Sequence, residues 1–265
     1  MRLLEALGDG IEAIDLAQPL EIGMPVSPTH PAFQFALRER HGDVVRADGI
    51  TGSHEMIVLG GHVGTHMDAL CHVAVDGRLF GGIPVADALR GGRYTAHGID
   101  QVPPLVRRGV LFDVPTMRGV DRLAPGEPVR LDDLRAHGAP EPERGDVALV
   151  RTGWAQHWGD PPAYLGDRRG VPGLDAAAAA WLAGRGVAAV GADTVALEHI
   201  PPGAGPAALP VHRLLLAEHG INLIEVMNLE VLAARGAAEF LFVGAPLNVR
   251  GATGAPIRPL ALIGP

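Results

Sequence analysis

Four residues of the kind that bind metal ions lie within eleven positions of one another. The segment GGHVGTHMDALCH (60–72) contains His62, His66, Asp68 and His72, at successive offsets of 4, 2 and 4. All these offsets are even, so an extended chain would point the four side chains to the same side. On a helix, Asp68 would lie roughly 200° round from His66, and the glycines of the segment also disfavour a helix. The spacing predicts a strand or extended loop that presents three imidazoles and one carboxylate together.

The donor atoms indicate the class of ion. Imidazole nitrogen combined with carboxylate oxygen suits zinc, manganese or iron. A metal site usually needs ligands from elsewhere in the chain, and the candidates are His212 and Glu225. Glu225 lies in the apolar run INLIEVM (221–227), where a carboxylate is costly unless it is paired or bound to a metal. The alternatives are a Glu225 side chain that faces water from an edge strand and a purely structural His212.

Residues that contact a substrate are harder to recognise. The candidates are Trp154, His157, Trp158, Glu198, Phe33 and Arg258. The aromatic residues between 154 and 158 could line a pocket that accepts an aromatic group, although tryptophans packed into the edge of a core are equally expected. Arg258 could bind a product carboxylate, and the alternative is a structural ion pair.

Short strands and a few helices must position these residues. Apolar and β-branched runs predict an early strand with a turn at 13–26, and strands at 55–59, 108–114, 145–152, 187–193, 221–227 and 239–249. Acidic first turns, an alanine run and closing glycines predict helices at 131–138, 174–186 and 211–220. Strands mixed with so few helices indicate the α/β class rather than an eight-fold barrel. No segment resembles a linker, so we expect one domain over residues 1–265.

The composition restricts the partners and the compartment. A formal net charge of -8 without a basic run argues against a nucleic-acid partner, and aromatic residues at 4% argue against stacking on single strands. Cys71 is the only cysteine, so no intramolecular disulfide can form and a reducing compartment is expected. We find no signal peptide and no run near the ~20 apolar residues of a membrane helix. A cytoplasmic protein with a small-molecule substrate and no membrane partner is expected.

The histidine-rich segment also resembles a known family. HVGTHMDALCH is similar to the HxGTHxDxxxH signature of the cyclase-like metal-dependent hydrolases, which include kynurenine formamidase and isatin hydrolase. Further similar stretches are DLAQPLEIGMPVSPTHP, RTGWAQHW, GADTVALE, VHRLLLAEHGINLIEVMNL and APLNVRGATGAPIRPLAL, so the resemblance spans nearly the whole chain. Leu70 replaces the proline of the common signature, and DALCH followed by DGRLFGG is closer to the isatin hydrolases. The spacing of thirteen between His212 and Glu225 is one longer than we expect for the formamidases.

The resemblance implies a fold and a set of roles. The implied fold is a single compact α/β domain with a β-barrel-like core and a few flanking helices, of the swivelling β/β/α type, in homodimers or homotetramers. His62, His66 and Asp68 match the ligands of a first metal, and His72 matches a histidine that acts as acid and base. His212 and Glu225 match the ligands of a second zinc in formamidase-like members. Isatin hydrolase-like members are associated with manganese, so one or two Mn²⁺ or Zn²⁺ ions are expected.

The implied activity is hydrolysis of an amide or cyclic amide, such as an aryl formamide or an isatin-like lactam. A metal ion makes water acidic enough to attack a carbonyl at neutral pH. His72 would take the proton of that water and deliver it to the leaving nitrogen. Lactones and cyclic ureides are alternative substrates for the same chemistry.

Three readings from other classes are weighed against hydrolysis. His66, Asp68 and His212 would also satisfy the two-histidine, one-carboxylate triad of an iron oxygenase. Cys71 could act as a nucleophile beside His72, but neighbouring residues on a strand point to opposite sides. The third alternative is a protein that binds a metal or ligand without catalysis.

Overall fold

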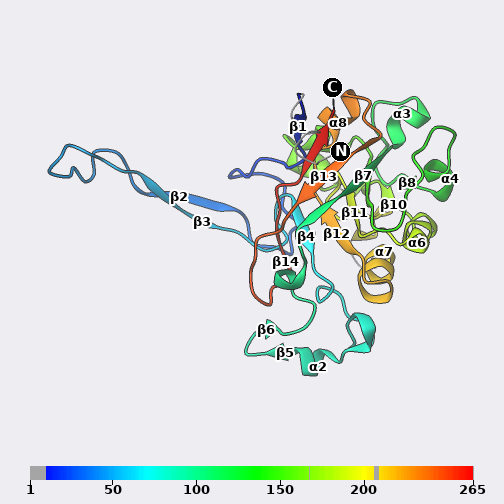
Figure 1. The fold of residues 1–265 in the computed structure, drawn as a ribbon, viewed down its shortest axis with the longest axis horizontal. Helices are drawn as coiled ribbons and strands as arrows, with labels where there is room; N and C mark the ends of the chain where they lie inside the picture. Colours follow the sequence, from blue (N-terminus) through cyan, green and yellow to red (C-terminus); the bar gives the residue numbers. More distant parts are fainter. Residues whose placement is uncertain (1–9, 167, 206–208, 265) are drawn as a thin grey trace.

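A strongly curved sheet of nine strands forms the centre of the molecule in a computed structural model (Figure 1). The structure describes residues 10–166, 168–205 and 209–264. The order across the sheet is β1-β15-β13-β7-β9-β11-β12-β4-β14. The bounds of these strands are β1 Glu12–Asp15, β4 His66–Asp68, β7 Leu105–Asp113, β9 Val147–Arg151, β11 Ala189–Ala192, β12 Asn222–Glu225, β13 Glu239–Gly244, β14 Gly254–Pro256 and β15 Leu260–Ile263.

The four central strands are parallel, and antiparallel strands extend the sheet at both ends. β7, β9, β11 and β12 run parallel to one another. Every residue of β9 is buried, as expected for a parallel strand that is covered on both faces. Val147 and Leu149 pack into one hydrophobic core, and Ala148 and Val150 pack into another on the opposite face. The apolar runs of the sequence therefore become strands that separate two cores.

Within the part of the chain that the structure describes, the helices are short, and α6 (Ala176–Arg185) is the longest. The Asp175 carboxylate caps its first turn by accepting a hydrogen bond from the N–H of Ala178, and α6 ends at Gly186 with a φ of +73°. The other helices are α2 Val85–Ala88, α3 Val114–Arg118, α4 Leu131–Leu134, α5 Pro161–Tyr164, α7 Pro210–His212, α8 Glu230–Ala234, the 3₁₀ helices η1 Phe80–Gly82, η2 Ile99–Gln101 and η3 Trp154–His157, and the π-helix η5 Arg213–Glu218. Within the described ranges, no helix has the length and apolar character needed to cross a membrane.

The described residues also form three small two-stranded sheets. β8 (Pro128–Val129) pairs with β10 (Gly173–Leu174), and β5 (Leu89–Arg90) pairs with β6 (Arg93–Tyr94). β2 (Gln34–Glu39) and β3 (His54–Val58) form an antiparallel hairpin. This hairpin extends far from the body of the molecule (Figure 1). We call residues 34–58 the arm.

The buried elements follow the sequence-based expectations most closely. The strands expected at 108–114, 145–152, 187–193 and 221–227 are β7, β9, β11 and β12, and the helix expected at 174–186 is α6. The strand expected at 55–59 is β3 of the arm. The predicted α/β fold with a curved, barrel-like sheet and few helices is therefore confirmed.

Four predicted elements are shorter or different from the expectation. Of the strand with a turn expected at 13–26, the strand is limited to β1, which ends before Pro19, and the turn lies at 22–23. The strand expected at 239–249 ends with β13, two residues before Pro246. The helix expected at 131–138 is the single turn α4, and the helix expected at 211–220 begins as α7 and continues as the π-helix η5.

Candidate metal centre

β4 places two of the predicted ligands on one face of the sheet. His66 and Asp68 are two residues apart in β4, so their side chains share a face. β4 pairs in antiparallel register with β12, and Glu225 stands directly opposite His66. Side chains directly opposite each other on antiparallel strands also share a face. The strand register therefore brings Glu225 to the histidine cluster.

The expectation of one extended segment through residues 60–72 is wrong, because strand geometry is confined to β4. Residues 61–65 form turns and bends, and Gly64 has a φ of +67°. This turn packs tightly against β14: a Cβ added to Gly61 would lie 2.6 Å from the carbonyl oxygen of Gly254. Glycine at these positions permits a sharp turn before β4, which a continuous strand would not contain.

His62 and His72 enter the site from turns on either side of β4. The Nδ1 atom of His62 lies 2.7 Å from Asp68 Oδ1, and its Nε2 atom lies 2.9 Å from Thr253 Oγ1. The backbone N–H of His72 donates to the carbonyl of Ala69, and its Nε2 atom lies 4.0 Å from Asp68 Oδ2. The rings of His62 and His72 are 4.1 Å apart. Turns, rather than a common strand direction, place these two imidazoles beside Asp68.

His66 and His212 each have Nδ1 fixed by the protein and Nε2 directed at carboxylates. The Nδ1–H group of His66 donates to the carbonyl oxygen of Gly64 at 2.8 Å, and Nδ1 of His212 lies 2.5 Å from Glu198 Oε1. The two Nε2 atoms lie 3.4 and 3.2 Å from oxygens of Glu225. Metal-binding histidines are usually oriented in this way, with one nitrogen bonded to a carbonyl or carboxylate and the other free for the ion.

Glu198 lies behind His212 rather than in contact with the cavity. Its carboxylate is 1% exposed. It accepts hydrogen bonds from the backbone N–H groups of Val211 and His212, both at 3.1 Å. The same carboxylate also makes the hydrogen bond with Nδ1 of the His212 ring. The sequence suggested Glu198 as a substrate contact, whereas the structure places it where it orients the start of α7 and the His212 imidazole.

The carboxylates of Asp68 and Glu225 fit a cation site. The two residues are 1% and 4% exposed. Asp68 Oδ2 and Glu225 Oε1 accept no hydrogen bond of good geometry from the described residues, although Oε1 lies 3.2 Å from His212 Nε2, and this is costly for buried carboxylates. Two ligands held about 2.1 Å from one zinc ion at the tetrahedral angle are about 3.4 Å apart. His66 Nε2 lies 3.4 Å from both Asp68 Oδ1 and Glu225 Oε2.

Asp68 belongs to two possible metal-binding groups. One group is His66, Asp68 and Glu225, and the other is His62, Asp68 and His72; the ligand atoms of each lie within 4.8 Å of one another. His212 adjoins both groups, with Nε2 3.8 Å from Asp68 Oδ2. The family resemblance instead implied a first site of His62, His66 and Asp68 and a second site with His212 and Glu225. The shared carboxylate leaves room for one ion or two, and the number of ions stays a prediction.

The charges of the cluster shift the pKa values of its members. Burial lowers the pKa of His66, but the Asp68 and Glu225 carboxylates outweigh burial and raise it to about 10. Burial raises the pKa of Asp68, but His62 and His66 outweigh it and hold the pKa well below its ordinary value. For His72, burial lowers the pKa more than the nearby Asp68 raises it. Asp68 is therefore ionised at neutral pH, and His72 is a neutral base.

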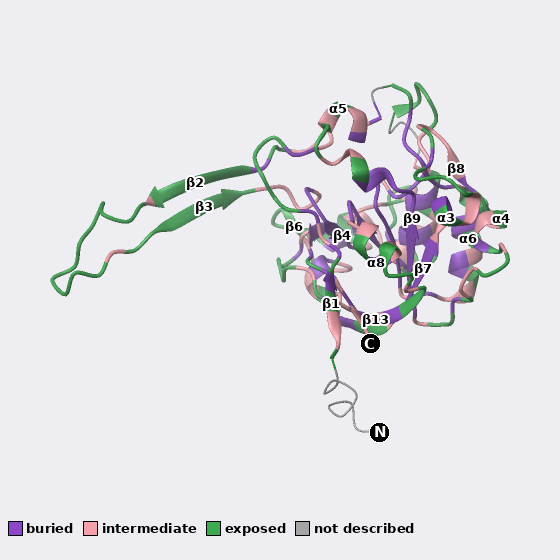
Figure 2. Cartoon of the chain, turned by 90° about the horizontal axis from the view of Figure 1, so that it is seen from above, coloured by how far each residue is buried: buried purple, intermediate pink, exposed green. Residues whose placement is uncertain are grey.

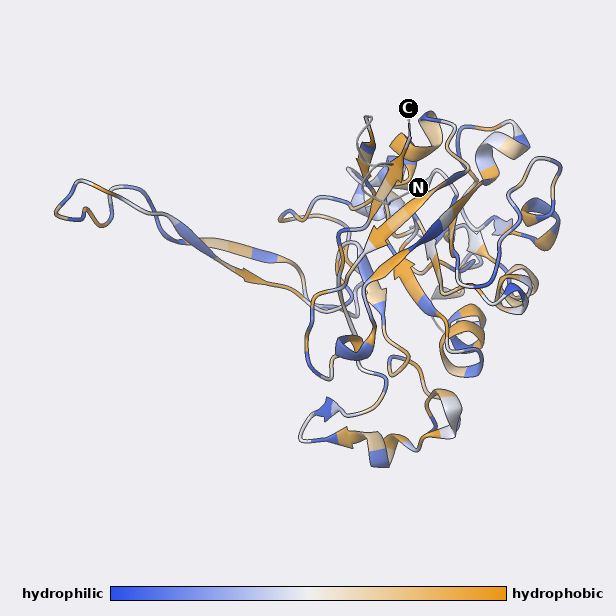
Figure 3. Ribbon diagram, in the orientation of Figure 1, coloured by the Kyte–Doolittle hydropathy of each residue, from blue (hydrophilic) through white to orange (hydrophobic). Residues whose placement is uncertain are grey.

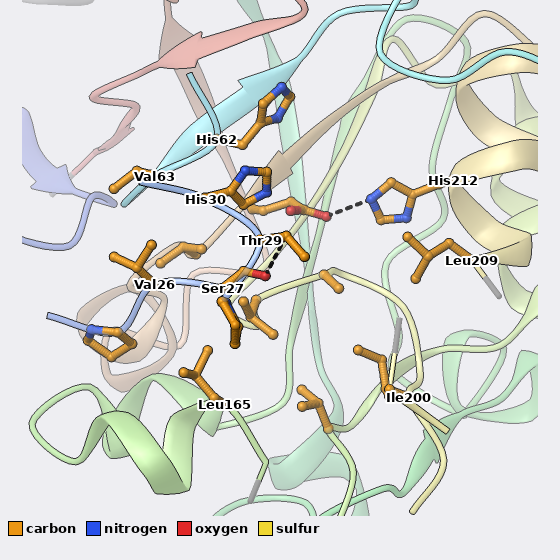
Figure 4. Close-up of a pocket in the computed structure, with 18 of the residues that line it drawn as sticks. Val26, Ser27, Thr29, His30, His62, Val63, Leu165, Ile200, Leu209 and His212 are labelled. Atoms are coloured by element: carbon orange, nitrogen blue, oxygen red, sulfur yellow. Dashed lines mark hydrogen bonds and ion pairs between the residues drawn. The ribbon is translucent and has the colours of Figure 1, made fainter. Parts of the chain in front are cut away.

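The cluster lies at one end of a cavity of about 540 Å³. Figure 4 shows His30, His62 and His212 toward one end of this cavity, and Leu165 and Ile200 at the other. Most of the remaining wall is apolar and is formed by Pro25, Val26, Val63, Val171, Val195, Leu209 and Val226. A concave, mainly apolar pocket with a few convergent polar groups is the usual form of a small-molecule site.

Three predicted substrate contacts, Trp154, His157 and Phe33, are not among the described residues that line the cavity. Trp154 is buried, and its Nε1–H group donates to the carbonyl oxygen of Tyr164 at 2.7 Å. The ring of His157 packs against Trp154, with 4.6 Å between the centroids. Phe33 is buried in a small hydrophobic cluster beside the cavity. Trp154 packs with the wall residues Val171 and Val226, and Phe33 packs with the wall residue Val63.

Other residues named from the sequence also lie outside the cavity. Arg258 pairs with Asp15 at 2.7 Å, and its side chain is 79% exposed. Trp158 packs edge-on against Tyr164. Cys71 is buried, with Sγ 3.7 Å from the carbonyl oxygen of Ala252. None of these three residues lines the described wall of the cavity.

Sequence reasoning missed three residues at the site. His30 lines the cavity and stacks on His62 with 5.6 Å between the ring centroids. Arg168 also lines the cavity, and Thr253 contacts His62 from the far end of the chain. His30 lies in the stretch MPVSPTHP, which carried part of the family resemblance, so that match was the available signal. Thr253 lies in APLNVRGATGAPIRPLAL, another stretch that carried the family resemblance, whereas nothing local in the sequence marks Arg168.

Comparison with family models identifies the group of proteins to which this site belongs. The model of a family described as putative cyclase matches residues 14–199, which is more than half of the chain. The chain belongs to the putative cyclase family. The resemblance predicted from the histidine-rich segment is thereby confirmed.

Similar proteins carry cyclase or hydrolase descriptions. An isatin hydrolase from Roseibium aggregatum is 28% identical over 224 residues, which cover 82% of this chain and 77% of the relative. The crystal structure of a novel cyclase has a TM-score of 0.86 and 27% identity, with 98% and 92% of the two chains covered. Isatin hydrolase A from Ralstonia solanacearum has a TM-score of 0.74 and 26% identity, with 100% and 98% covered. The predicted cyclase fold is thus confirmed.

Proposed function

We propose that this cyclase-family protein is a metal-dependent hydrolase that cleaves an amide or cyclic amide bond, such as that of an isatin-like lactam or an aryl formamide. The observation that carries this proposal is the buried cluster at the end of an apolar cavity. In that cluster, Asp68 and Glu225 each have a carboxylate oxygen without a hydrogen-bond partner in the described part of the chain. Family membership and the similarity to two isatin hydrolases support the hydrolase class.

The chain offers a complete set of ligands for a divalent ion. His66, Asp68, Glu225 and His212 would hold it, and His62 would contribute a further imidazole. Manganese and zinc both suit this mixture of nitrogen and oxygen donors. A divalent ion bound here would polarise the substrate carbonyl and increase the acidity of water.

His72 is the proposed acid and base. Its side chain is 29% exposed and lines the cavity, so a small substrate and water reach it. A neutral imidazole at this position accepts a proton from the attacking water and then donates it to the leaving nitrogen. The buried Asp68 carboxylate, 4.0 Å from His72 Nε2, stabilises the imidazolium between these two steps.

The wall of the cavity favours a compact, largely apolar substrate that yields an acid. Apolar side chains such as Val26, Leu165 and Ile200 match a flat ring or short hydrocarbon. Arg168 is the only lysine or arginine among the described residues that line the cavity. Hydrolysis of a lactam or formamide releases a carboxylate, and a guanidinium binds carboxylates well. We therefore assign to Arg168 the product-binding role that the sequence suggested for Arg258.

Elemental analysis of the purified protein beside a His66→Ala variant tests the proposal. Turnover of isatin, an aryl formamide, a lactone and a cyclic ureide is measured on the same samples. We expect near-stoichiometric manganese or zinc in the wild type, little in the variant, and turnover of at least one amide only with metal present. A wild type that binds metal but turns over no member of the panel would instead indicate a binding protein.

His72→Gln separates the proposed base from a metal ligand. If His72 moves protons, the variant keeps its metal and loses roughly 10²–10⁴-fold in turnover. If His72 is chiefly a ligand, metal content falls together with activity. His137, which lies outside the site, provides a matched control, and His137→Gln is expected to change neither quantity.

A further inference from the structure

Both ring nitrogens of His62 lie within hydrogen-bond distance of a protein oxygen. Nδ1 is 2.7 Å from Asp68 Oδ1, and Nε2 is 2.9 Å from Thr253 Oγ1. A neutral imidazole has one N–H group and one acceptor nitrogen, and a carboxylate only accepts. In the absence of an ion, Nδ1–H therefore donates to Asp68, and Nε2 accepts a hydrogen bond from the Thr253 hydroxyl.

The loop before β14 fixes the position of Thr253. The carbonyl oxygen of Thr253 accepts a hydrogen bond from the N–H of Ala69 at 2.9 Å. One residue earlier, the carbonyl oxygen of Ala252 accepts from the N–H of Ile99, also at 2.9 Å. These bonds tie the loop to the end of β4 and to η2. The Thr253 hydroxyl is therefore held beside His62 by the backbone that carries it.

Gly254, the next residue, leaves room for the His62 ring. It begins β14 and stands directly opposite Asp68 in β4, so a side chain at 254 would point to the same face as the Asp68 carboxylate. The His62 ring occupies that space: a Cβ on Gly254 would lie 2.5 Å from Cε1 of the ring and 3.0 Å from each ring nitrogen. Glycine at 254 thus lets the ring lie between Asp68 and Thr253.

The surroundings of these residues keep water away. Figure 2 shows β4 in the colour of buried residues, and Figure 3 shows the strands at the centre of the sheet mainly in the colour of hydrophobic residues. The His62 side chain is only 11% exposed. In such a place, a lost hydrogen bond is not readily replaced by water. The orientation of His62 therefore depends on its protein partners.

We propose that Thr253 and Gly254 are positioning residues of the candidate metal centre, which hold His62 so that Nδ1, and not Nε2, faces the ion. An ion takes the lone pair of one ring nitrogen, and the proton then lies on the other. A hydroxyl both donates and accepts, so Thr253 also accepts the Nε2–H of the ion-bound ring. His66 and His212 have the opposite arrangement, because their Nδ1 atoms are the ones that the protein fixes.

This inference rests on the proposed function, because it requires a metal ion in the cluster. Zinc is a suitable probe, since a site of nitrogen and oxygen donors that binds manganese generally binds zinc more tightly. Competition with a chromophoric chelator measures the zinc affinity of the full chain. This measurement needs no substrate, so it separates the role of Thr253 from any effect on catalysis.

Thr253→Val keeps the shape of the side chain but removes the partner of His62 Nε2, so we expect zinc binding to weaken about 10–100-fold. Thr253→Ser retains the hydroxyl and is expected to bind zinc nearly as tightly as the wild type. Thr51→Val is the matched control, because it removes a hydroxyl that lies 2.9 Å from His41 Nδ1 in the arm. It is expected to leave the affinity unchanged.

Far-UV circular dichroism and thermal melting of the metal-free proteins check that each variant is folded. A folded Thr253→Val protein with wild-type zinc affinity overturns the role of Thr253 and leaves the proposed function intact. A wild type that binds no zinc overturns both.

Gly254→Ala tests the space for the ring. The added methyl group would meet the end of the His62 side chain rather than backbone, so we expect the ring to move away from Thr253 while the fold persists. Zinc affinity should then fall by about tenfold or more. Gly184→Ala adds the same group in α6, where nothing lies within 4 Å, and should change nothing. Wild-type affinity in a folded Gly254→Ala protein contradicts the proposed role of Gly254.

Imidazole ¹⁵N NMR of the zinc-loaded wild type identifies the ligating atom directly and does not depend on the folding of the Thr253 and Gly254 variants. Long-range ¹H–¹⁵N correlations distinguish a metal-bound nitrogen from a protonated one. We expect zinc on Nδ1 and a proton on Nε2 for His62, and the reverse for His66 and His212. The loss of signals in His62→Gln assigns those of His62. Zinc on Nε2 of His62, or on neither of its nitrogens, overturns the proposal.

Discussion

At the scale of single residues, the hydrogen bond at Nδ1 decides what each imidazole can do with Nε2. Nδ1 of His66 is hydrogen-bonded to the carbonyl oxygen of Gly64, and Nδ1 of His212 is hydrogen-bonded to the Glu198 carboxylate. A carboxylate partner also makes the imidazole a stronger donor to a cation. Glu198 therefore influences metal binding although it is not itself directed at the ion.

Glu198→Gln should weaken metal binding by roughly 10–100-fold, because the charged partner of His212 is lost while the side-chain volume is kept. Competition with a chromophoric chelator measures the affinity. Glu218→Gln, which alters an exposed glutamate paired with Arg213, is the matched control and should leave affinity unchanged. Equal affinities for wild type and Glu198→Gln would show that the contact only stabilises the fold.

Asp193 provides a pH-dependent contribution to stability that is independent of the metal centre. Burial raises the pKa of its carboxyl from 3.8 to about 6, although hydrogen bonds from Thr152 oppose this shift. The folded state therefore holds this proton more tightly than the unfolded state. The stabilisation is fully present below about pH 4 and is lost as the pH rises through about 6.

Asp193→Asn should remove this pH dependence. We expect the difference in unfolding free energy between wild type and variant to change by about 3 kcal/mol from pH 4 to pH 7, in the direction that favours the wild type at low pH. Urea denaturation of metal-free protein at several pH values measures it. A difference that stays constant with pH would contradict the raised pKa.

At the scale of elements, Thr65 joins three parts of the sheet that carry the site. Its hydroxyl donates to the carbonyl oxygen of Val226 at 2.6 Å and accepts from the N–H of Gln18 at 2.8 Å. These bonds connect three segments: Thr65 directly precedes β4, Val226 directly follows β12, and Gln18 lies shortly after β1. Val226 has a φ of +58°, so this hydroxyl also helps to hold a backbone conformation that valine rarely adopts.

Thr65→Val keeps the shape of the side chain but leaves two buried backbone groups without a partner. We expect it to lower the unfolding free energy by about 2–4 kcal/mol, since each buried unsatisfied group costs about 1–3 kcal/mol. Thr65→Ser retains the hydroxyl and should lose much less. Chemical denaturation compares the three proteins, and equal losses in the two variants would mean that the methyl group, not the hydroxyl, matters.

At the scale of the whole molecule, the candidate metal centre connects β4, β12 and α7, so ion binding should stabilise the entire fold. Without a cation, Asp68 and Glu225 are buried carboxylates with unsatisfied oxygens. An ion at 100 times its dissociation constant adds about 2.7 kcal/mol. We expect a chelator to lower the melting temperature of the wild type and to leave that of His66→Ala nearly unchanged. Identical melting curves of the wild type with and without chelator would contradict this.

The sequence by itself determined the features that depend on a few neighbouring residues. The apolar runs predicted the central strands, and the alanine run with its closing glycines predicted α6. The two-residue spacing of His66 and Asp68 placed them on one face, because side chains alternate along a strand. The types of residue in GGHVGTHMDALCH predicted a metal site, since donor chemistry does not depend on the fold.

Only the tertiary structure decided which distant residues join this cluster and in what role. The register of β12 against β4 put Glu225 opposite His66, and packing behind α7 made Glu198 the partner of His212 rather than a wall residue. The packing of distant segments likewise brought His30 and Thr253 into contact with His62. Strand register and the packing of loops are set by contacts between segments far apart in the chain, so no local pattern specifies them.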